Sequence, residues 1–577
     1  MTPSASEASP NPSMPRLVGL ARMAPGTVAV TAALLVVIAI ASVAIPAVSA
    51  DAVDEAVAGA GPGTALLTLS VLLVVRVAAE ACSGIAAVAA TTRIAAGMRH
   101  RLLRAVLDAD LRGLRDHPPG DLVTRLTANA AAGAGAVVTF VRVAVALATS
   151  LAGLTALWVI DWWLGAAFTA GLIPALFLIR LVMRRITSTQ ADYLNRLGAI
   201  AARMLDALAG LRTIRACGTA LREVDRVLRP LPDLVAAGHR TWQVQRGISW
   251  QAELILAGLR VCILALAGFG LAVGRLSAGE LLATALYLAI ALSILDQIDV
   301  LFGLGQARAS AARVLAVAGE GPADGGSEAG RRPRLPGGPG EVLLEGVTVR
   351  LESQTVLDDV HLEIPAGSSV AVVGRSGSGK TTLSQVVGGL IRPDRGRVRI
   401  DGADTAEVDP DSLRQEVRYA FEEPVLLGGT VGEAIGYGRP RPTAERVRQA
   451  AARAEASGFI ERLPAGFDTP LDRAPLSGGE RQRLGLARAI AGDGRILVLD
   501  DATSSLDTVT EAQVSAAVTE AAADRTRVVV AHRTATADRA DRVAWLERGR
   551  LRAIGSHRNL WATHPEYRAV FADRPTA

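Results

Sequence analysis

A glycine-rich segment that could hold a chain of phosphates begins at Gly374. It reads Gly374-x4-Gly379-Lys380-Thr381 and directly follows the apolar run Val370–Val373. Glycines let the backbone curl so that its N–H groups face phosphate oxygens, and the start of the next helix adds its dipole. Lys380 is the only lysine in the chain, which suits a position where a compact point charge must reach phosphate. A glycine-rich turn alone would not explain strand, loop and Lys-Thr in this order. The segment therefore predicts ATP binding by Gly374, Arg375, Ser376, Gly377, Ser378, Gly379, Lys380, Thr381 and Thr382.

A second motif places an acid where a metal ion would sit beside those phosphates. The stretch Arg495–Asp500 reads as a hydrophobic strand that ends in a carboxylate. This is the Walker-B pattern, in which the acid and a hydroxyl from the phosphate loop hold Mg²⁺. We therefore expect Mg²⁺ as a cofactor beside ATP, with Thr381 and Asp500 as its ligands.

The elements that must position these residues belong to an α/β P-loop domain. Beyond Glu341 strands and helices alternate, and before it the composition turns to Gly, Pro and Arg, as in a flexible linker. The expected organisation is a cytosolic tail over residues 1–24, a transmembrane domain over 25–318, a linker over 319–340 and the nucleotide-binding domain over 341–577.

The first half of the chain is too apolar for an ordinary soluble protein. Half of all residues are hydrophobic, 20% are charged and the mean hydropathy is +0.32. Apolar runs of about 20 residues suffice to cross a bilayer. Val48-Ser49-Ala50 could pass for a signal-peptide cleavage site, but the run before it is long, so we favour a retained span. The runs predict about six helical spans in a lipid bilayer, namely Thr27–Val48, Thr64–Ala90, Ala136–Ile160, Trp163–Met183, Ala252–Val273 and Glu280–Phe302.

The arginine distribution predicts the orientation of these spans. The long connections Arg93–Arg125 and Arg184–Arg246 are arginine-rich, whereas Ser49–Gly63 is acidic and lacks arginine. The positive-inside rule then puts both termini and the ATP-binding domain in the cytoplasm. The net charge of +5 comes from scattered arginines without an aromatic-interleaved basic patch, so nucleic acid is not an expected partner.

The segment Leu476-Ser-Gly-Gly-Glu-Arg-Gln-Arg483 makes the pattern specific, since it resembles the signature of ABC transporters. Ser505–Asp507 resembles the family's D-loop and His532 its switch histidine. Residues 101–127, 208–216 and 306–314 are similar to the intracellular loops and last span of exporter-type members. The resemblance implies a half-transporter in the cell membrane with alternating access. Its second half would bring another ATP against the signature residues Ser477, Gly478, Gly479 and Glu480.

Three positions depart from that family pattern, and all belong to one ATP site. Asp501 stands where the family has a catalytic glutamate, and a carboxylate about 1 Å out of place can cost roughly 100-fold in rate. Glu422 stands at the family's usual glutamine, where the resemblance implies a catalytic residue and a third Mg²⁺ ligand beside the γ-phosphate. Leu351 replaces the aromatic ring that stacks on adenine. We hypothesise that this site hydrolyses ATP poorly and that the complex is a heterodimer; a homodimer with an adequate Asp501 stays open.

The cargo and its direction are less determined than the energy source. The resemblance implies export of a small molecule, lipid or peptide, and the spans, rich in Ala, Leu and Val, do not name it. An importer of the siderophore type built on the same fold is one alternative. The other is a regulatory half that binds ATP with little hydrolysis of its own.

Overall fold

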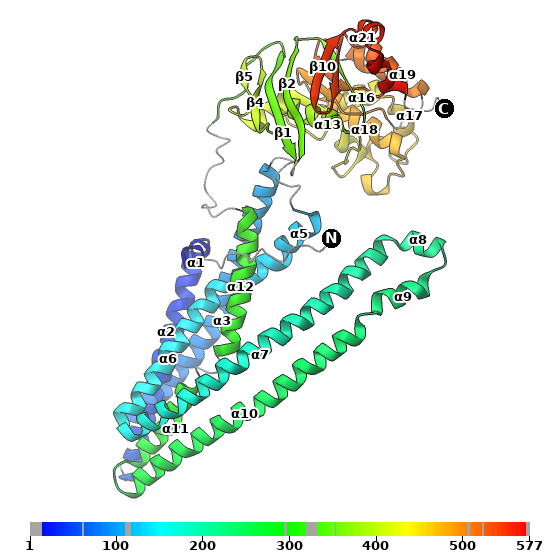
Figure 1. Cartoon of the computed structure of the whole chain (residues 1–577). Helices are drawn as coiled ribbons and strands as arrows, with labels where there is room; N and C mark the ends of the chain where they lie inside the picture. The colour runs from blue at the N-terminus through cyan, green and yellow to red at the C-terminus, as the bar shows by residue number, and fades with distance from the viewer. Residues whose placement is uncertain are drawn as a thin grey trace. The chain divides into compact units, whose positions relative to one another are not determined.

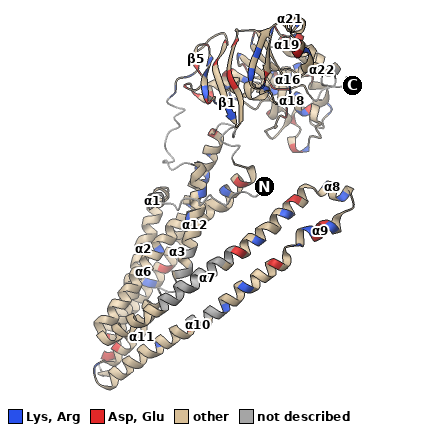
Figure 2. Cartoon of the chain, in the orientation of Figure 1, with Lys and Arg blue, Asp and Glu red and all other residues tan. Residues whose placement is uncertain are grey.

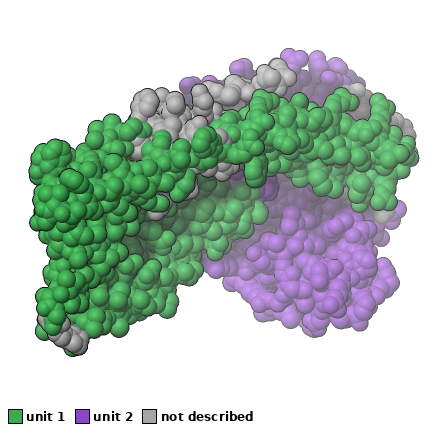
Figure 3. All heavy atoms as spheres, turned by 90° about the horizontal axis from the view of Figure 1, so that it is seen from below, with its two compact units in different colours: residues 1–104, 123–320 green, residues 105–122, 321–577 purple. Residues whose placement is uncertain are grey.

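The computed structural model describes residues 14–59, 63–109, 117–293, 297–318, 332–351, 354–504, 508–521 and 524–572. The chain divides into two compact units, coloured separately in Figure 3. Unit 1 comprises residues 1–104 and 123–320, and unit 2 comprises residues 105–122 and 321–577. The division near residue 320 falls at the start of the predicted linker, and the short segment 105–122 groups with unit 2.

Unit 1 is entirely helical in its described part. Long stretches rich in Ala and Leu favour helices that run for many turns, and these helices continue through an internal Pro46 in α2 and Pro174 in α7. A five-residue π-helical turn at Arg125–Asn129 interrupts one of them. The helices up to residue 318 are α1 (Met14–Ala21), α2 (Pro25–Val57), α3 (Thr64–Asp108), α5 (Pro119–Thr124), α6 (Ala130–Ile160), α7 (Trp162–Ala209), α8 (Leu211–Ala216), α9 (Ala220–Leu228), α10 (Leu231–Ala272), α11 (Ala278–Leu292) and α12 (Gln297–Ala318). Most of α5 and the last turn of α3 belong to unit 2.

Four of the predicted spans coincide with helices that are long and apolar enough to cross a membrane. These lie within Pro25–Val57, Thr64–Asp108, Pro119–Ile160 and Glu253–Ala272. The fourth predicted span falls in α7, where the side chains of residues 175–188 lie outside the described ones. The sixth was predicted as one run, but α11 ends at Leu292 and α12 begins at Gln297, with residues 294–296 not described. The count of six therefore stays a prediction.

Helices α7 and α10 form a long antiparallel pair. They pack chiefly on each other, and Figure 1 shows the pair leaving the other helices of unit 1, with α8 and α9 joining them at the tip. Charged residues of both signs follow the half of the pair nearest that tip (Figure 2). Large apolar side chains such as Trp242 and Trp250 are exposed along α10. The pair thus presents surface that its own unit does not cover.

Helices α2 and α11 are fastened together at one end by a carboxylate. Asp54 accepts hydrogen bonds from the Ser277 hydroxyl at 2.6 Å and from the Gly279 N–H at 2.8 Å. It therefore satisfies one backbone donor, the Gly279 N–H, that the start of α11 would otherwise leave free. A Cβ at Gly279 would lie 2.1 Å from the Ala50 carbonyl oxygen, so only glycine allows this approach. Further along, the Tyr287 hydroxyl donates to the Val43 carbonyl at 2.9 Å.

Unit 2 contains two sheets. The four-stranded sheet is antiparallel, in the order β2-β1-β4-β5, and the six-stranded sheet has the order β10-β9-β3-β8-β7-β6. Strands β6, β7, β8, β3 and β9 run parallel, and β10 is antiparallel to β9. The strands are β1 (Val342–Leu351), β2 (Gln354–Ile364), β3 (Ser369–Val373), β4 (Arg395–Ile400), β5 (Ala403–Asp404), β6 (Val417–Ala420), β7 (Ile496–Leu499), β8 (Thr526–Val530), β9 (Arg542–Glu547) and β10 (Arg550–Gly555).

The parallel sheet is covered by helices, which explains why a strand such as β3 is apolar along most of its length. All five residues of β3 are buried, as expected of a strand with both faces covered. A second apolar cluster packs α15, α16 and α18 together. The α-helices of unit 2 beyond residue 321 are α13 (Lys380–Val387), α14 (Pro410–Glu416), α15 (Val431–Ile435), α16 (Ala444–Arg453), α17 (Ser457–Ile460), α18 (Gly478–Ala491), α19 (Thr508–Ala521), α20 (Thr534–Asp538), α21 (His557–Thr563) and α22 (Pro565–Ala572).

Candidate nucleotide-binding site

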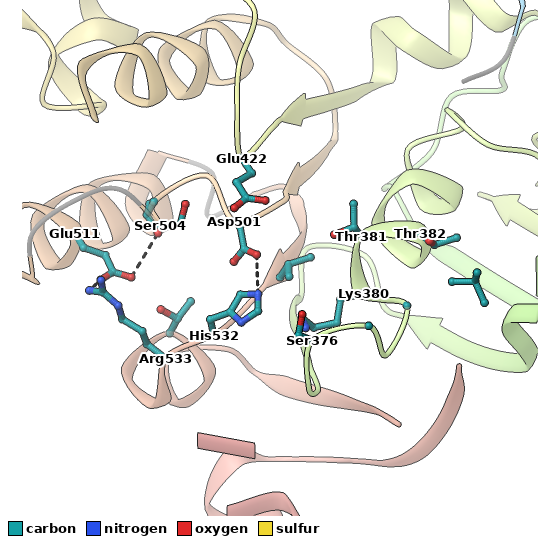
Figure 4. Close-up of a pocket in the computed structure, with 16 residues that line it drawn as sticks. Ser376, Lys380, Thr381, Thr382, Glu422, Asp501, Ser504, Glu511, His532 and Arg533 are labelled. Carbon is teal, nitrogen blue, oxygen red and sulfur yellow. Dashed lines mark hydrogen bonds and ion pairs between the residues drawn. The ribbon is translucent and has the colours of Figure 1, made fainter. Parts of the chain in front are cut away.

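A cavity of about 450 Å³ lies at the carboxyl ends of β3, β7 and β8. Ligands of open parallel sheets bind at this edge, where loops from neighbouring strands converge. Figure 4 shows Glu422, Asp501 and His532 one after another across the cavity from Thr381. The described residues that line it are Val356, Ser376, Gly377, Gly379, Lys380, Thr381, Thr382, Glu422, Asp501, Thr503, Ser504, Glu511, Val530, His532, Arg533 and Thr536.

The loop between β3 and α13 has the curled backbone that the glycines predicted. Gly379 has φ +99°, and a Cβ there would lie 2.8 Å from the Val356 carbonyl oxygen. A Cβ at Gly374 would lie 2.3 Å from the Leu546 carbonyl oxygen. Both positions therefore need glycine for close packing, and Gly379 needs it for its backbone conformation as well. The loop delivers Lys380 to the first residue of α13, where a helix dipole favours anions.

Lys380 is 5% exposed and folds back over its own loop. Its ammonium donates to the carbonyls of Gly374 at 2.9 Å and Arg375 at 3.0 Å. A buried charge needs such partners. Lys380 also lines the cavity, where its ammonium can meet a polyphosphate. Gly374, Arg375 and Ser378 belong to the loop without lining the cavity.

Asp500 follows β7 and presents one carboxylate oxygen with no partner. The Tyr419 hydroxyl donates to its Oδ2 at 2.7 Å, and Ser384 Oγ lies 2.8 Å from the same hydroxyl. Its Oδ1 is buried and has no hydrogen-bond partner among the described residues. Burial raises the pKa of this carboxyl. An orphaned buried oxygen near a hydroxyl fits a hard cation, so Asp500 and Thr381 are suited to Mg²⁺.

The described residues contain no cluster of three or more His, Cys, Asp or Glu that could hold a metal ion alone. Mg²⁺ is commonly bound by one or two protein groups, waters and substrate phosphates. A site made of Asp500 and Thr381 is therefore the kind that completes itself only with a bound polyphosphate.

Asp501 pairs directly with His532. Its Oδ2 lies 2.6 Å from His532 Nε2, although the two residues come from the ends of different strands. Asp501 has φ +49°, a left-handed conformation that Asp adopts more readily than most residues. Backbone and side chain thus both hold the short carboxylate toward the imidazole.

Glu422 adds a further carboxyl to the cavity. Burial raises its pKa, and the nearby charges of Asp501 and Asp500 raise it further. The segment that carries it is held in place because Gln482 Nε2 donates to the Glu422 carbonyl at 2.7 Å and to Ser504 Oγ at 3.0 Å. Glu422 and Asp501 therefore both line the cavity, and the buried Asp500 lies next to them in the chain without lining it.

Sequence reasoning missed an ion pair on the cavity wall. Arg533 pairs with Glu511, and Thr503 Oγ1 donates to Glu511 Oε1 at 3.4 Å. The only sequence signal was that Arg533 follows His532, and Glu511 carried none. Leu351 was predicted to stand at the position next to the adenine ring of ATP. It is absent from the described residues that line the cavity, and its side chain packs against the apolar core of the sheets.

The signature residues lie at the start of α18 and outside this cavity. Ser477 caps the helix, and its hydroxyl accepts from the Glu480 N–H at 3.3 Å. The Glu480 carboxylate in turn accepts from the Ser477 N–H at 2.8 Å, which lowers the pKa of Glu480. This capping box leaves the N–H groups of Gly478 and Gly479 in the first turn of a helix. The predicted D-loop, Ser505–Asp507, lies outside the described residues.

Comparison with known proteins agrees with this geometry. The ABC transporter transmembrane region model matches residues 28–295, and the ABC transporter model matches residues 357–504. The chain is 45% identical over 476 residues to the ABC transporter ATP-binding protein RamA of Streptomyces coelicolor, covering 82% of this chain and 74% of that protein. It is 31% identical over 486 residues to an ATP-dependent lipid A-core flippase of Chromobacterium violaceum, covering 82% and 81%.

A solved structure extends the similarity to the whole fold. The structure of a bacterial Atm1-family ABC exporter with ATP bound superposes with a TM-score of 0.76 at 26% identity, covering 97% of this chain and 99% of that one. The similarity therefore covers both the helical membrane region and the nucleotide-binding domain of this chain. The chain belongs to the ABC transporter family, as an exporter-type half-transporter that couples ATP binding and hydrolysis to transport across a membrane.

Proposed function

We propose that this chain is one half of a dimeric exporter in the cell membrane that moves a small molecule, lipid or peptide outward. The cavity with its buried Lys380, on the same polypeptide as the membrane helices, is the observation that carries the proposal. A relative that matches this chain over 82% of its length is named a lipid A-core flippase, and this similarity favours an amphipathic cargo. Both termini and the ATPase domain face the cytoplasm, in keeping with the arginine-rich connections.

Two features support a second half-transporter as the partner. The α7–α10 pair carries apolar surface that unit 1 leaves exposed, and such surface favours association. The helix N-terminus at Ser477, Gly478 and Gly479 is suited to bind anions, yet these residues do not line the chain's own cavity. In a head-to-tail pair, that helix start would meet the γ-phosphate of an ATP held by the other half.

The residues in and beside the cavity have separate roles in ATP binding and hydrolysis. The glycine loop and Lys380 bind the phosphates, and Thr381 with Asp500 would hold Mg²⁺, which neutralises charge on the phosphate chain. Asp501 is the candidate base for the attacking water, and His532 orients it through their 2.6 Å contact. Binding of ATP closes the paired domains and shifts the membrane helices between two states; hydrolysis and release reset them.

The chain's own site is the weaker of two in a heterodimer. Asp501 is one methylene shorter than glutamate and is already bound to His532, while Glu422 adds negative charge beside the phosphates. Both features slow attack on the γ-phosphate without preventing ATP from binding. A homodimer would instead require that Asp501 reach its water despite this pairing.

Transport direction and energy source can be tested without knowing the cargo. Inverted and right-side-out membrane vesicles from cells producing the chain with its genomic neighbours are supplied with ATP, and their contents are compared by mass spectrometry. We expect a compound that accumulates in inverted vesicles only, and that is absent with Lys380→Ala. Accumulation in right-side-out vesicles would instead identify an importer. Unchanged contents in both preparations would favour a regulatory half.

A further inference from the structure

The turn between α10 and α11 is held from two sides by carboxylates. Arg275 in this turn pairs with Asp161, which directly precedes α7, at 3.5 Å. On the other side, Asp54 of α2 accepts hydrogen bonds from the Ser277 hydroxyl at 2.6 Å and from the Gly279 N–H at 2.8 Å. The turn therefore fastens α2, α11 and the corner between α6 and α7 together at one end of unit 1.

An apolar seal lies between these two polar contacts. Leu276 is 6% exposed and belongs to a buried cluster with Ala50 of α2, Leu157 of α6, and Leu164 and Phe168 of α7. Figure 1 shows the α7–α10 pair meeting α2, α6 and α11 at this end and leaving them toward the tip at α8 and α9. The helices of unit 1 are thus packed together at the turn and diverge away from it.

The two contacts join different sets of helices. Helices α7 and α10 pack chiefly on each other, so the Arg275–Asp161 contact stays within one helical pair when that pair moves. The Asp54 contact instead ties α11 to α2. Next to it, the described residues leave an apolar hollow of about 480 Å³ between α2, α3 and α11, lined among others by Val53 and Leu69. This end of α2 therefore has space beside it, and hydrogen bonds through Asp54 fasten it to α11.

We propose that Asp54 is the latch of an outer gate, whose hydrogen bonds to the start of α11 break each time cargo leaves. The inference rests on the proposed transport role and on the orientation that puts the acidic connection after α2 outside the cell. A carrier with two alternating states must part the end that is packed here, because cargo cannot pass an apolar seal. The Tyr287–Val43 hydrogen bond, about 16 Å further along α2, is the pivot about which the outer turns of α2 swing.

The first test makes the latch covalent. Asp54→Cys and Ser277→Cys are introduced into the full chain, with its three exposed native cysteines replaced by serine, and are joined by a short bis-methanethiosulfonate cross-linker. We expect the linked protein to bind MgATP as before but to lose ATP-driven accumulation in vesicles, and reduction of the link to restore it. Accumulation that continues with the link in place would refute the proposal. So would the absence of linked peptides by mass spectrometry, because the two side chains would then not be in contact.

The second test does not depend on the cargo. Leu276→Cys in the same background is labelled with a membrane-impermeant maleimide in right-side-out vesicles. We expect labelling to be about tenfold faster when Asp54→Asn is added, because the amide lacks the charge that strengthens the hydrogen bonds of the latch. As a control, Ala58→Cys, at the exposed end of α2, should be labelled equally fast with and without Asp54→Asn.

Equal labelling rates of Leu276→Cys with and without Asp54→Asn would overturn the gate and leave the proposed transport role intact. If the wild-type chain accumulates no compound in either vesicle preparation, the transport role fails by itself. The labelling rates then still decide whether Asp54 holds this end of unit 1 closed, so the two failures can be told apart.

Discussion

Substituting Asp501 by glutamate should accelerate ATP hydrolysis at this site. The present carboxylate ends about 1 to 1.5 Å short of a glutamate's reach, and its Oδ2 lies 2.6 Å from His532 Nε2. Misplacement of about 1 Å costs on the order of 100-fold in rate. Glutamate is less suited than Asp to the left-handed backbone at φ +49°, at a cost of about 1 kcal/mol of stability. The expected net gain is about 10- to 100-fold in kcat.

The assay is steady-state phosphate release by the chain in lipid nanodiscs, with single-turnover rates measured in parallel. Asp501→Asn is the matched control, because Asn keeps the size and the backbone preference but cannot act as a base. We expect wild type and Asp501→Asn to be similarly slow, and Lys380→Ala to remove the gain made by Asp501→Glu. A wild-type rate equal to that of Asp501→Glu, lost in Asp501→Asn, would refute the reasoning and favour a homodimer.

Three further predictions follow from other contacts. Glu422→Gln should tighten MgATP binding by about tenfold at pH 7.5 and make that binding less dependent on pH. The pKa of Glu422 is already raised and bound phosphates raise it further, so MgATP binding to the wild type improves as pH falls. Equal pH profiles of binding for the two proteins, measured by calorimetry, would contradict this. Tyr419→Phe removes the 2.7 Å hydrogen bond to Asp500 and should raise the Mg²⁺ concentration needed for half-maximal ATP binding by about three- to tenfold. An unchanged Mg²⁺ titration would show that this hydrogen bond is dispensable for Mg²⁺ binding. Gly279→Ala should lower the melting temperature in detergent by several degrees, because the added Cβ would meet the α2 backbone at a cost of about 1–3 kcal/mol. The control Gly84→Ala in α3 should leave the melting temperature unchanged, because a Cβ there has nothing within 4 Å. Equal shifts for the two variants would rule out the clash.

The phosphate loop could be predicted because its geometry is local. A buried strand, glycines at two tight positions and Lys-Thr at a helix start specify the curl within a few residues, and Gly379 at φ +99° matches it. The apolar runs that became α2, α3, α6 and α10 were predictable for a similar reason, since length and composition decide whether a helix can span a bilayer. Neither prediction depended on which other segments pack against these residues in the folded chain.

Contacts between distant segments could not be predicted in this way. The Asp501–His532 pair depends on β7 and β8 lying side by side in parallel register, which brings their carboxyl ends to one edge. The Glu511–Arg533 pair and the turn of Leu351 into the core likewise depend on packing across several elements. No spacing along the chain encodes these distances.

The sequence by itself determined the class of this protein: membrane helices followed by an ATP-binding domain with P-loop, Walker-B acid and signature. It also identified the three unusual positions, because the residue type alone decides how far a carboxylate reaches or whether a ring is present. Only the tertiary structure decided how those positions behave. Asp501 is held by an imidazole, Glu422 is pushed toward protonation and Leu351 is withdrawn from the cavity, because orientation and burial arise from neighbours that the fold brings together.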